Sequence, residues 1–289
     1  MTRLSDFSDR LVASQSMQVS SSMMSRFTDQ LDALRRAASK RPSLRNPSMF
    51  SRTTLWIDGE RAHALDSPVT TPLSPAGDVA AALKAIEALA PAPARPGFHV
   101  LRVIVGAPFV RYHALPWQPL PKPDDWVSAA RMQAVQAGAG AEPWRYAVCD
   151  GVWGRGRLAA AMSEAFCAGI ERICKARKLQ LAGIEPGYTF ALHRHARRIR
   201  DGAIAIAGLE ETAGAAAIAH IGFRHGGGWT GFVTLPVPGA LDDLWRDAFA
   251  LCNADAPERR YVIGPGAADR WIANAAQVEW LAAPWDASV

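Results

Sequence analysis

The sequence contains no apolar run long enough to cross a membrane. Its longest apolar runs, such as Ala203–Ala207 and Ala213–Ala219, are short and rich in alanine, whereas a transmembrane helix needs about 20 consecutive apolar residues. The N-terminus lacks the charged, apolar and small-residue regions of a signal peptide. We therefore expect a soluble, cytoplasmic chain with no membrane span of its own.

The sequence is also poor in residue patterns typical of catalysis or metal binding. Its four cysteines include no CxxC pair, which argues against a zinc site or a redox dithiol and favours reduced thiols. His193 and His195 are two residues apart, so on a helix they would face different sides. No serine lies in a GxSxG motif, and Glu210 and Glu211 are expected to lie in a solvated turn. These residues predict no catalytic group, no metal site and no cofactor.

The charge balance does not favour nucleic acid as a partner. The net charge is +5. Residues 1–50 carry eight Lys and Arg against four Asp and Glu, and the remaining residues are close to neutral. A small basic excess at one end suits an acidic protein or lipid surface better than nucleic acid.

Residues 1–48 differ in composition from the rest and are expected to form a partly disordered N-terminal extension. They are rich in Ser, Met, Arg and Asp and contain few large apolar groups. Within them, Met23, Phe27, Leu31 and Leu34 follow helical spacing, which predicts a short amphipathic helix. This helix either packs on its own domain or frays in solvent, or its single apolar stripe binds a partner's groove.

From residue 49 on, strand-like and helix-like runs follow one another in two successive units. Asp58-Gly59 between the runs 53–57 and 61–65 predicts a hairpin, and residues 67–76 are expected to form a loop. Two units of several mostly antiparallel strands followed by a helix and a strand indicate a mixed α/β fold of two related lobes. The other expected strands are 99–105, 109–114, 144–149, 157–162, 179–184, 203–209, 215–222, 230–235, 260–263 and 278–281, and the expected helices are 78–89, from 124 or 125 onward, 163–178 capped by Ser163, from 187 onward, and 240–252.

The run from residue 98 to residue 187 carries a family resemblance. Its order is similar to that of actin-like assembly proteins of bacterial secretion and pilus machines: the cytoplasmic domain of the type II secretion L protein (GspL) and the type IV pilus M protein (PilM). The resemblance implies an α/β, actin-like (ribonuclease H-like) fold, with lobe I at residues 49–200 and lobe II at residues 201–289. The residues that carry it are Val103–Trp117 (VIVGAPFVRYHALPW), Trp126–Arg131, Tyr146–Asp150, Arg157–Ala161 (RLAAA) and Gly169–Pro186 (GIERICKARKLQLAGIEP).

The resemblance also implies a function. It indicates a scaffold or assembly-platform protein of a type IV pilus or type II-like secretion system, which links an assembly ATPase to a short-tailed inner-membrane subunit. Such a protein would be peripheral to the inner membrane through these partners. The alternative is a nucleotide-binding actin-like ATPase, similar to PilM, that binds ATP with Mg²⁺ at a divergent site.

The residues of that alternative nucleotide site lie in two glycine-containing turns. Actin-like ATPases hold phosphate in two such hairpins, the first usually an Asp-x-Gly-x-x-[Ser/Thr] turn. Here Asp58 and Gly59 are adjacent, the Ser or Thr is missing, and Glu60 adds negative charge. The second hairpin is expected at 221–230, where Gly226, Gly227 and Gly228 suit either a plain turn or an anion nest. Gly264-Pro265-Gly266 is expected at the adenine-side loop. Together these departures predict a degenerate ATP site and no enzymatic activity.

Two further groups of residues are predicted to bind partners. Arg194, Arg197 and Arg198 lie in the basic run HRHARRIR, which forms either a solvated face or a docking surface for carboxylates or lipid headgroups. Trp117 and Trp126 flank a proline-rich loop, where an exposed pair would anchor an interface.

Overall fold

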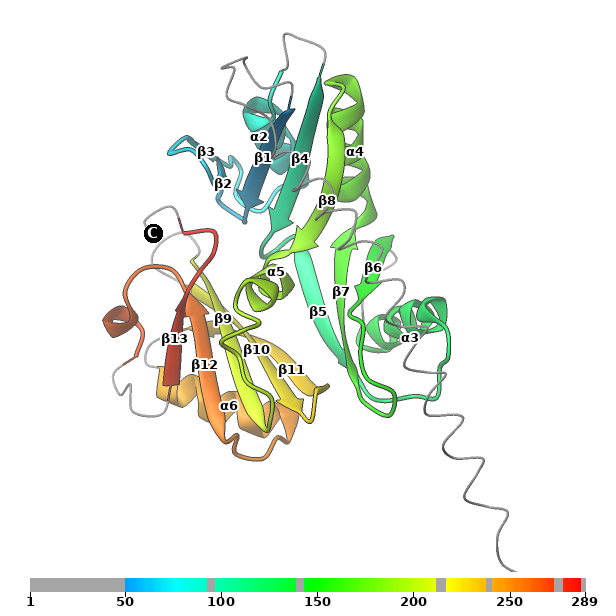
Figure 1. The fold of residues 1–289 in the computed structure, drawn as a ribbon, viewed down its shortest axis with the longest axis vertical. Helices are drawn as coiled ribbons and strands as arrows, with labels where there is room; N and C mark the ends of the chain where they lie inside the picture. The colour runs from blue at the N-terminus through cyan, green and yellow to red at the C-terminus, as the bar shows by residue number, and fades with distance from the viewer. Residues whose placement is uncertain are drawn as a thin grey trace, which may run out of the picture. The chain divides into compact units, whose positions relative to one another are not determined.

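The structure of the chain is a computed structural model (Figure 1). It describes residues 50–92, 97–138, 143–211, 217–237, 241–272 and 278–286. All of these residues belong to one compact unit, residues 49–289. The predicted N-terminal helix with Met23, Phe27, Leu31 and Leu34 lies outside the described residues.

The first sheet has five strands in the order β3-β2-β1-β4-β8 (Figure 1). β1 (Phe50–Ile57) and β2 (Arg61–Ala64) form the predicted hairpin, and β3 (Thr70–Pro72) pairs antiparallel with β2. β4 (Phe98–Val105) pairs in parallel with β1, and β8 (Gln180–Pro186) pairs in parallel with β4. Helix α2 (Val79–Leu89) leads from β3 to β4, and the Asp78 carboxylate caps it by accepting the Ala81 N–H at 2.7 Å.

The second sheet repeats the arrangement of the first, in the order β11-β10-β9-β12-β13. β9 (Ile204–Glu211), β10 (Ala217–His225) and β11 (Gly228–Val237) are antiparallel, and β12 (Arg259–Gly264) and β13 (Val278–Ala282) are parallel to β9. Helix α6 (Leu241–Cys252) leads from β11 to β12, as α2 does in the first sheet, and a short 3-10 helix, η2 (Ala268–Arg270), precedes β13. The two units thus share strand order and strand direction.

Between β4 and β8 the chain adds a smaller subdomain. It contains β5 (Val110–Leu115), α3 (Pro123–Gln136), β6 (Trp144–Val148), β7 (Arg157–Ser163) and α4 (Glu164–Ala176), and its three strands form an antiparallel sheet in the order β5-β7-β6. Helix α5 (Gly187–Arg194) follows β8 and leads to β9. The lobe boundary predicted at residue 200 falls in this connection between α5 and β9.

One hydrophobic core contains residues from both five-stranded sheets. Leu55 and Ile104 of the first sheet and Ile206 and Ile263 of the second are fully or almost fully buried in the same cluster. A second cluster lies around Trp245 of α6 and the strands β9 and β10. Because the central strands are covered on both faces, they read as apolar runs rather than as alternating ones.

Two local expectations differ from the structure. Residues Thr70–Pro72, predicted to be loop, form the edge strand β3, and an edge position tolerates a proline because one side of the strand has no partner. Ser163 stands at the N-cap of α4, but its side chain makes no capping hydrogen bond. It is also the last residue of β7.

Candidate functional site

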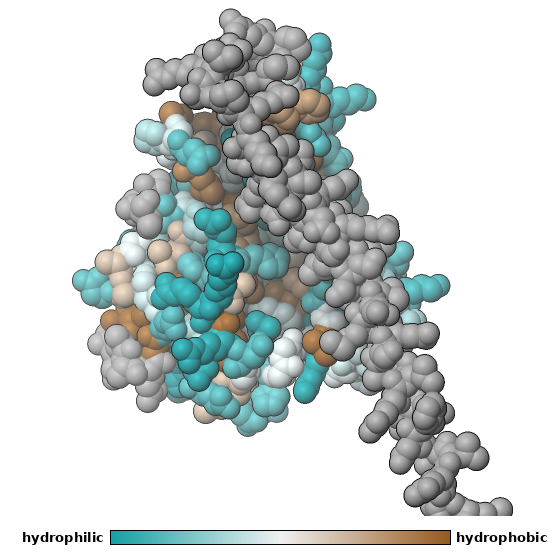
Figure 2. Space-filling view, in the orientation of Figure 1, coloured by the Kyte–Doolittle hydropathy of each residue, from teal (hydrophilic) through white to brown (hydrophobic). Residues whose placement is uncertain are grey.

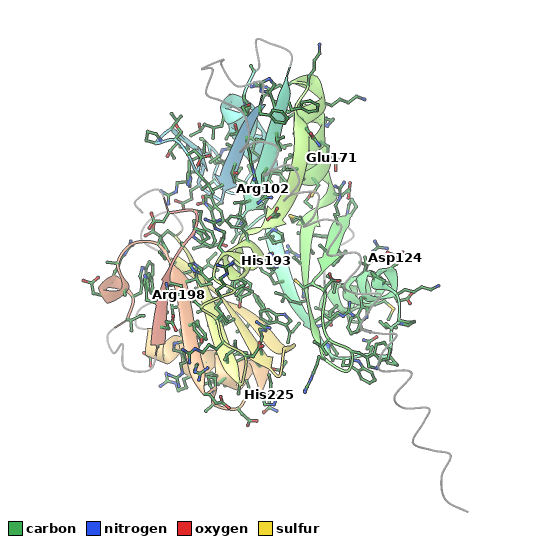
Figure 3. The ribbon with its side chains drawn as sticks, in the orientation of Figure 1. Arg102, Asp124, Glu171, His193, Arg198 and His225 are labelled. Atoms are coloured by element: carbon green, nitrogen blue, oxygen red, sulfur yellow. The ribbon has the colours of Figure 1, made fainter. Side chains whose placement is uncertain are left out.

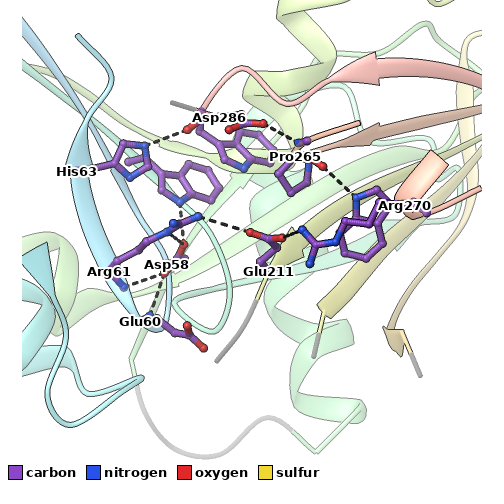
Figure 4. Close-up of polar contacts among 12 residues, drawn as sticks. Asp58, Glu60, Arg61, His63, Glu211, Pro265, Arg270 and Asp286 are labelled. Atoms are coloured by element: carbon purple, nitrogen blue, oxygen red, sulfur yellow. Dashed lines mark hydrogen bonds and ion pairs between the residues drawn. The ribbon is translucent and has the colours of Figure 1, made fainter. Parts of the chain in front are cut away.

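Asp58, the first residue of the predicted nucleotide site, lies in the β1–β2 turn with both carboxylate oxygens occupied (Figure 4). Oδ1 accepts hydrogen bonds from the backbone N–H groups of Glu60 and Arg61, each at 2.9 Å. Oδ2 accepts one from Trp56 Nε1 at 3.0 Å and lies 3.7 Å from Arg61 Nε. Asp58 is buried. Its carboxylate therefore closes its own turn, as Asp side chains commonly do.

Side chains from other elements cover the glycines at this junction between the two sheets. A Cβ on Gly59 would lie 2.9 Å from Pro108 Cδ, and a Cβ on Gly106 would lie 2.6 Å from Glu210 Oε2 and 2.8 Å from Trp56. In a phosphate-binding turn, the bare glycine backbone faces the ligand. Here the protein's own side chains lie against it.

Glu210 connects the two sheets and does not lie in a solvated turn. It is 2% exposed within β9, and its Oε2 accepts a hydrogen bond from the Ala107 backbone N–H at 2.6 Å. Its Oε1 lies 3.6 Å from His220 Nε2, which is also buried. The expectation of a solvated turn is wrong because β9 continues through Glu210 and packs against residues 106 and 107.

Charged side chains surround the Asp58 turn (Figure 4). Glu211 forms an ion pair with Arg270 and lies 3.8 Å from Arg61 Nη2. Burial, and then the nearby Asp58 carboxylate, raise the pKa of Glu60. Both arginines are engaged by carboxylates of the chain itself, so the positive charge next to the turn is already balanced.

Residues that follow β13 cover Trp56 of β1. Trp285 is 4% exposed and stacks on Trp56, with ring centroids 4.2 Å apart and an interplanar angle of 8°. His63 Nε2 donates to the Trp285 carbonyl oxygen at 2.9 Å, and burial lowers the pKa of His63. Asp286 Oδ2 accepts the Gly266 N–H at 2.6 Å. This segment therefore fastens β1 and β2 of the first sheet to the loop after β12 of the second.

The predicted adenine-side loop, Gly264-Pro265-Gly266, is held in the same way. The Pro265 carbonyl oxygen accepts a hydrogen bond from Trp271 Nε1 at 2.9 Å. Since the Gly266 N–H is bound to Asp286, the Pro265 carbonyl and the Gly266 N–H both have partners within the chain.

Gly226, Gly227 and Gly228 lie far from Asp58. They form the β10–β11 turn, where Gly226 and Gly227 have φ of 56° and 81°, and the Arg155 side chain lies against Gly226 and Gly228. β10 spans nine residues, from Ala217, which pairs with Glu211, to His225 at this turn. The turn therefore lies about 26 Å from Ala217 along the strand. In Figure 3, His225 marks this far end of β10.

The repeated strand order corrects the position expected for the second hairpin. β9 and β10 of the second sheet correspond to β1 and β2 of the first, so the counterpart of the Asp58 turn is the connection at residues 212–216. This connection lies outside the described residues. The triple glycine at 226–228 indicates a turn, but a turn signal does not show which strands of a sheet it joins.

The residues around Asp58 do not fit a magnesium–nucleotide complex. Magnesium needs carboxylate oxygens with free lone pairs, and phosphate needs free N–H donors or unpaired cations. The buried Asp58 carboxylate already accepts three hydrogen bonds, Gly59 is covered by Pro108, and Arg61 lies between two carboxylates. Glu210 adds a further buried carboxylate at the junction.

The predicted basic surface is only partly free. Arg198 forms an ion pair with Glu279 at 3.0 Å and donates to the Trp280 carbonyl oxygen at 3.3 Å. Arg194 and Arg197 are exposed and have no ion pair within the described part of the chain. Figure 2 shows hydrophilic side chains gathered over the region of α5 and the adjoining strands of the second sheet, and Figure 3 marks His193 and Arg198 there.

The predicted tryptophan pair is corrected by the structure. Trp126 is 2% exposed and its Nε1 donates to the Leu120 carbonyl oxygen at 2.9 Å, so it cannot contact a partner. Trp117 is 44% exposed, and its exposed aromatic neighbour is Trp153, whose ring lies 6.0 Å away at 82°. Trp153 and Val152 project from the β6–β7 loop and are both more than half exposed. The glycines around Trp153 indicate a loop, but the sequence contains no pattern that predicts the contact between Trp153 and Trp117.

Within the described residues, no three His, Cys, Asp or Glu side chains are placed to hold a metal ion. None of the helices in those residues has the length and hydropathy required to traverse a lipid bilayer.

Comparison with known proteins identifies similar structures at low sequence identity. The cytoplasmic domain of EpsL, an inner-membrane component of the type II secretion system of Vibrio cholerae, is 11% identical, with 80% of this chain and 88% of that chain covered and a TM-score of 0.45. A PilM–PilN type IV pilus biogenesis complex is 14% identical, with 83% and 90% covered and a TM-score of 0.49. A Bacteroides thetaiotaomicron protein with an actin-like ATPase fold and unknown function is 7% identical, with 80% and 90% covered and a TM-score of 0.46.

The chain has the two related lobes that the sequence predicts. Their repeated strand order and strand directions are those expected of an actin-like fold. No family model matches the chain, and no curated protein matches it.

Proposed function

We propose that this chain is a non-enzymatic scaffold of a type IV pilus or type II-like secretion system. In this role it lies in the cytoplasm, peripheral to the inner membrane, and links an assembly ATPase to a short-tailed inner-membrane subunit. Residues 49–200 and 201–289 serve as its two lobes, and residues 1–48 as a separate extension. The proposal rests on the resemblance carried by residues 98–187 and on the geometry around Asp58.

The observation that supports a scaffold over an ATPase is the state of the Asp58 turn. An actin-like ATPase needs an Asp carboxylate free for magnesium and a glycine turn free for phosphate. The Asp58 carboxylate instead accepts three hydrogen bonds from its own turn and from Trp56. The Glu210–Ala107 hydrogen bond and the Trp56–Trp285 stack then connect the two lobes across the same junction. These contacts favour a fixed arrangement of lobes that presents surfaces to partners.

Two exposed groups are the surfaces that we assign to partners. Arg194 and Arg197, the basic surface, are suited to carboxylate groups because guanidinium binds them with two parallel hydrogen bonds. Trp117 and Trp153, the tryptophan pair, present large aromatic area of the kind enriched at interface hot spots. The apolar stripe of Met23, Phe27, Leu31 and Leu34 stays a third predicted surface.

Affinity purification of the tagged full chain from membrane extracts of its own cells tests this proposal. An assembly ATPase, an inner-membrane protein, or both should be recovered, as identified by mass spectrometry. The double variant Arg194→Glu/Arg197→Glu should lower the recovery of one of them at least about fivefold, because it reverses two charges that supply bidentate bonds. Lys84→Glu, at an exposed position on α2, is the matched control and should leave recovery unchanged. Recovery of neither protein with the unaltered chain would contradict the proposed role.

A further inference from the structure

The small sheet β5-β7-β6 has one face that α3 covers only in part. Leu115 and Ala159 lie on this face beneath Trp126 and Ala130 of α3, and all four are buried in one small cluster. The opposite face of the same sheet belongs to the main core. Helix α3 therefore covers the end of this face that contains Leu115 and Ala159, and it does not cover the other end.

Within the described residues, no helix covers the other end of this face, because α3 ends at Gln136. Its last buried residue is Ala134, and the chain leaves the helix at Gly138, where φ is +82°. Beyond that point lies a cleft of about 100 Å³ with Ala161 of β7 among its lining residues. Arg111 and Tyr146 pair with Ala161 from the two sides of β7, so all three lie in one row of the same face.

The size of the cleft limits what it can hold. Sites for nucleotides and other small-molecule ligands usually have volumes of roughly 300–1,000 Å³. This cleft, of about 100 Å³ and open to solvent on one side, encloses less space than such sites and has room for a single protein side chain. Its small lining residues, Ala134, Ala137 and Ala161, leave this room because they end at Cβ.

The walls include two aromatic rings, Trp144 and Tyr146, and one cation, Arg111, while Arg131 lies outside the lining and contacts Tyr146. The Arg111 guanidinium lies 4.4 Å from the centre of the Trp144 ring, and that of Arg131 lies 5.9 Å from the Tyr146 ring. Stacking on an aromatic ring holds a guanidinium in place while leaving its N–H edge free. Neither arginine forms an ion pair within the described residues, whereas Arg145, on the other face of the same sheet, binds both Glu164 and Glu171.

His113 adds a polar group without adding charge at neutral pH. It lines the cleft on β5, and burial, together with the neighbouring Arg111, lowers its pKa. A neutral imidazole can donate or accept one hydrogen bond. The cleft therefore combines one fixed positive charge, a neutral hydrogen-bonding group and apolar walls.

We propose that this cleft binds one acidic side chain, an Asp or Glu carboxylate, from a peptide segment of a partner protein. The carboxylate pairs with Arg111, and the stem of the acidic side chain packs between Trp144 and Ala161. The site shares no residue with the basic surface or the tryptophan pair. The test of this proposal is therefore independent of the test of the function proposed above.

The probe for this site is N-acetylglutamate methylamide, compared with its glutamine analogue. The full chain is labelled with 5-fluorotryptophan, and the Trp144 signal is assigned in the ¹⁹F NMR spectrum through Trp144→Phe. A ligand that presents one side chain should bind with a Kd on the order of 1 mM. We expect a saturable shift of the Trp144 signal with the glutamate probe and at least tenfold weaker binding of the glutamine probe.

Two variants test the assignment to Arg111. Arg111→Gln should weaken binding of the glutamate probe at least tenfold, and Arg172→Gln, at an exposed position on α4, should leave it unchanged. Equal binding of the two probes to the unaltered chain would overturn the proposal even if a variant failed to fold. Undiminished binding to Arg111→Gln would also overturn it, as would an equal response to inorganic phosphate.

The chain's own Glu142 is the competing occupant. It precedes Trp144 by two positions and lies outside the described residues. If the unaltered chain gave no shift and Glu142→Gln then bound the glutamate probe, the occupant would be the chain itself, and the proposal of a partner's side chain would be overturned. Equal binding to the unaltered chain and to Glu142→Gln supports it.

Discussion

Replacement of Trp285 by alanine tests how strongly the segment after β13 fastens the two lobes. Trp285 is 4% exposed and stacks on Trp56 at a centroid distance of 4.2 Å. Removal of a buried tryptophan side chain typically costs 3–5 kcal/mol. Because Trp285 follows the last strand and its segment can partly collapse into the space, we expect the lower end, about 3 kcal/mol. The hydrogen bond from the His63 side chain to the Trp285 carbonyl oxygen can survive the substitution, because its acceptor is a backbone atom.

Urea denaturation followed by far-ultraviolet circular dichroism measures this effect. Tryptophan fluorescence is unsuitable because the chain has ten tryptophans and the variant removes one of them. With an m-value of about 3 kcal/mol per molar urea, the midpoint should fall by about 1 M. Trp153→Ala is the matched control. Its ring is 63% exposed, and it should change the free energy of unfolding by less than about 0.5 kcal/mol. A loss below about 1 kcal/mol for Trp285→Ala, or equal losses for the two variants, would refute the assigned role.

Two further predictions concern stability. Burial lowers the pKa of His63 and of His113 below the ordinary 6.5. Near and below pH 6.5 the unfolded chain therefore binds protons that the folded chain does not. The free energy of unfolding should fall as the pH drops from about 7 to 5. Urea midpoints across this range measure the effect. His63→Asn should flatten the slope, and an unchanged slope in this variant would count against the assignment to His63. Separately, a Cβ on Gly156 would lie 2.2 Å from the Trp229 carbonyl oxygen and 2.7 Å from that of Leu115, so Gly156→Ala should cost at least about 2 kcal/mol by forcing backbone apart. Gly183→Ala is the control, because a Cβ there would lie 3.6 Å from its nearest neighbour, Glu185 Oε1. It should lower the free energy of unfolding by about 1 kcal/mol or less. Equal losses in the two variants would contradict a rigid backbone contact at Gly156.

The order of elements could be predicted from the sequence because most strands here are continuous apolar runs bounded by turns. The hairpin at Asp58 and the run RLAAA in β7 are clear examples, since each has its turn or apolar signal within a few residues. The strand β3 could not be predicted, because three residues with a proline carry no periodicity.

The details of the candidate site depend on contacts between distant residues, which local patterns do not specify. A glutamate next to a second glutamate is typical of a surface turn, but Glu210 is buried. Its carboxylate accepts a hydrogen bond from the Ala107 N–H, which lies more than 100 positions away in the sequence. Trp126 reads as exposed next to a proline-rich loop, but it is the centre of a small core under Arg157. The position of the second phosphate hairpin required the strand order of the second sheet, which a triple glycine does not reveal.

Calorimetric titration of the full chain with Mg-ATP tests the central claim, that the actin-like fold is retained here without its nucleotide chemistry. The occupied Asp58 carboxylate and the covered Gly59 predict no binding tighter than about 1 mM. Micromolar binding of Mg-ATP that is lost in Asp58→Ala would contradict the account.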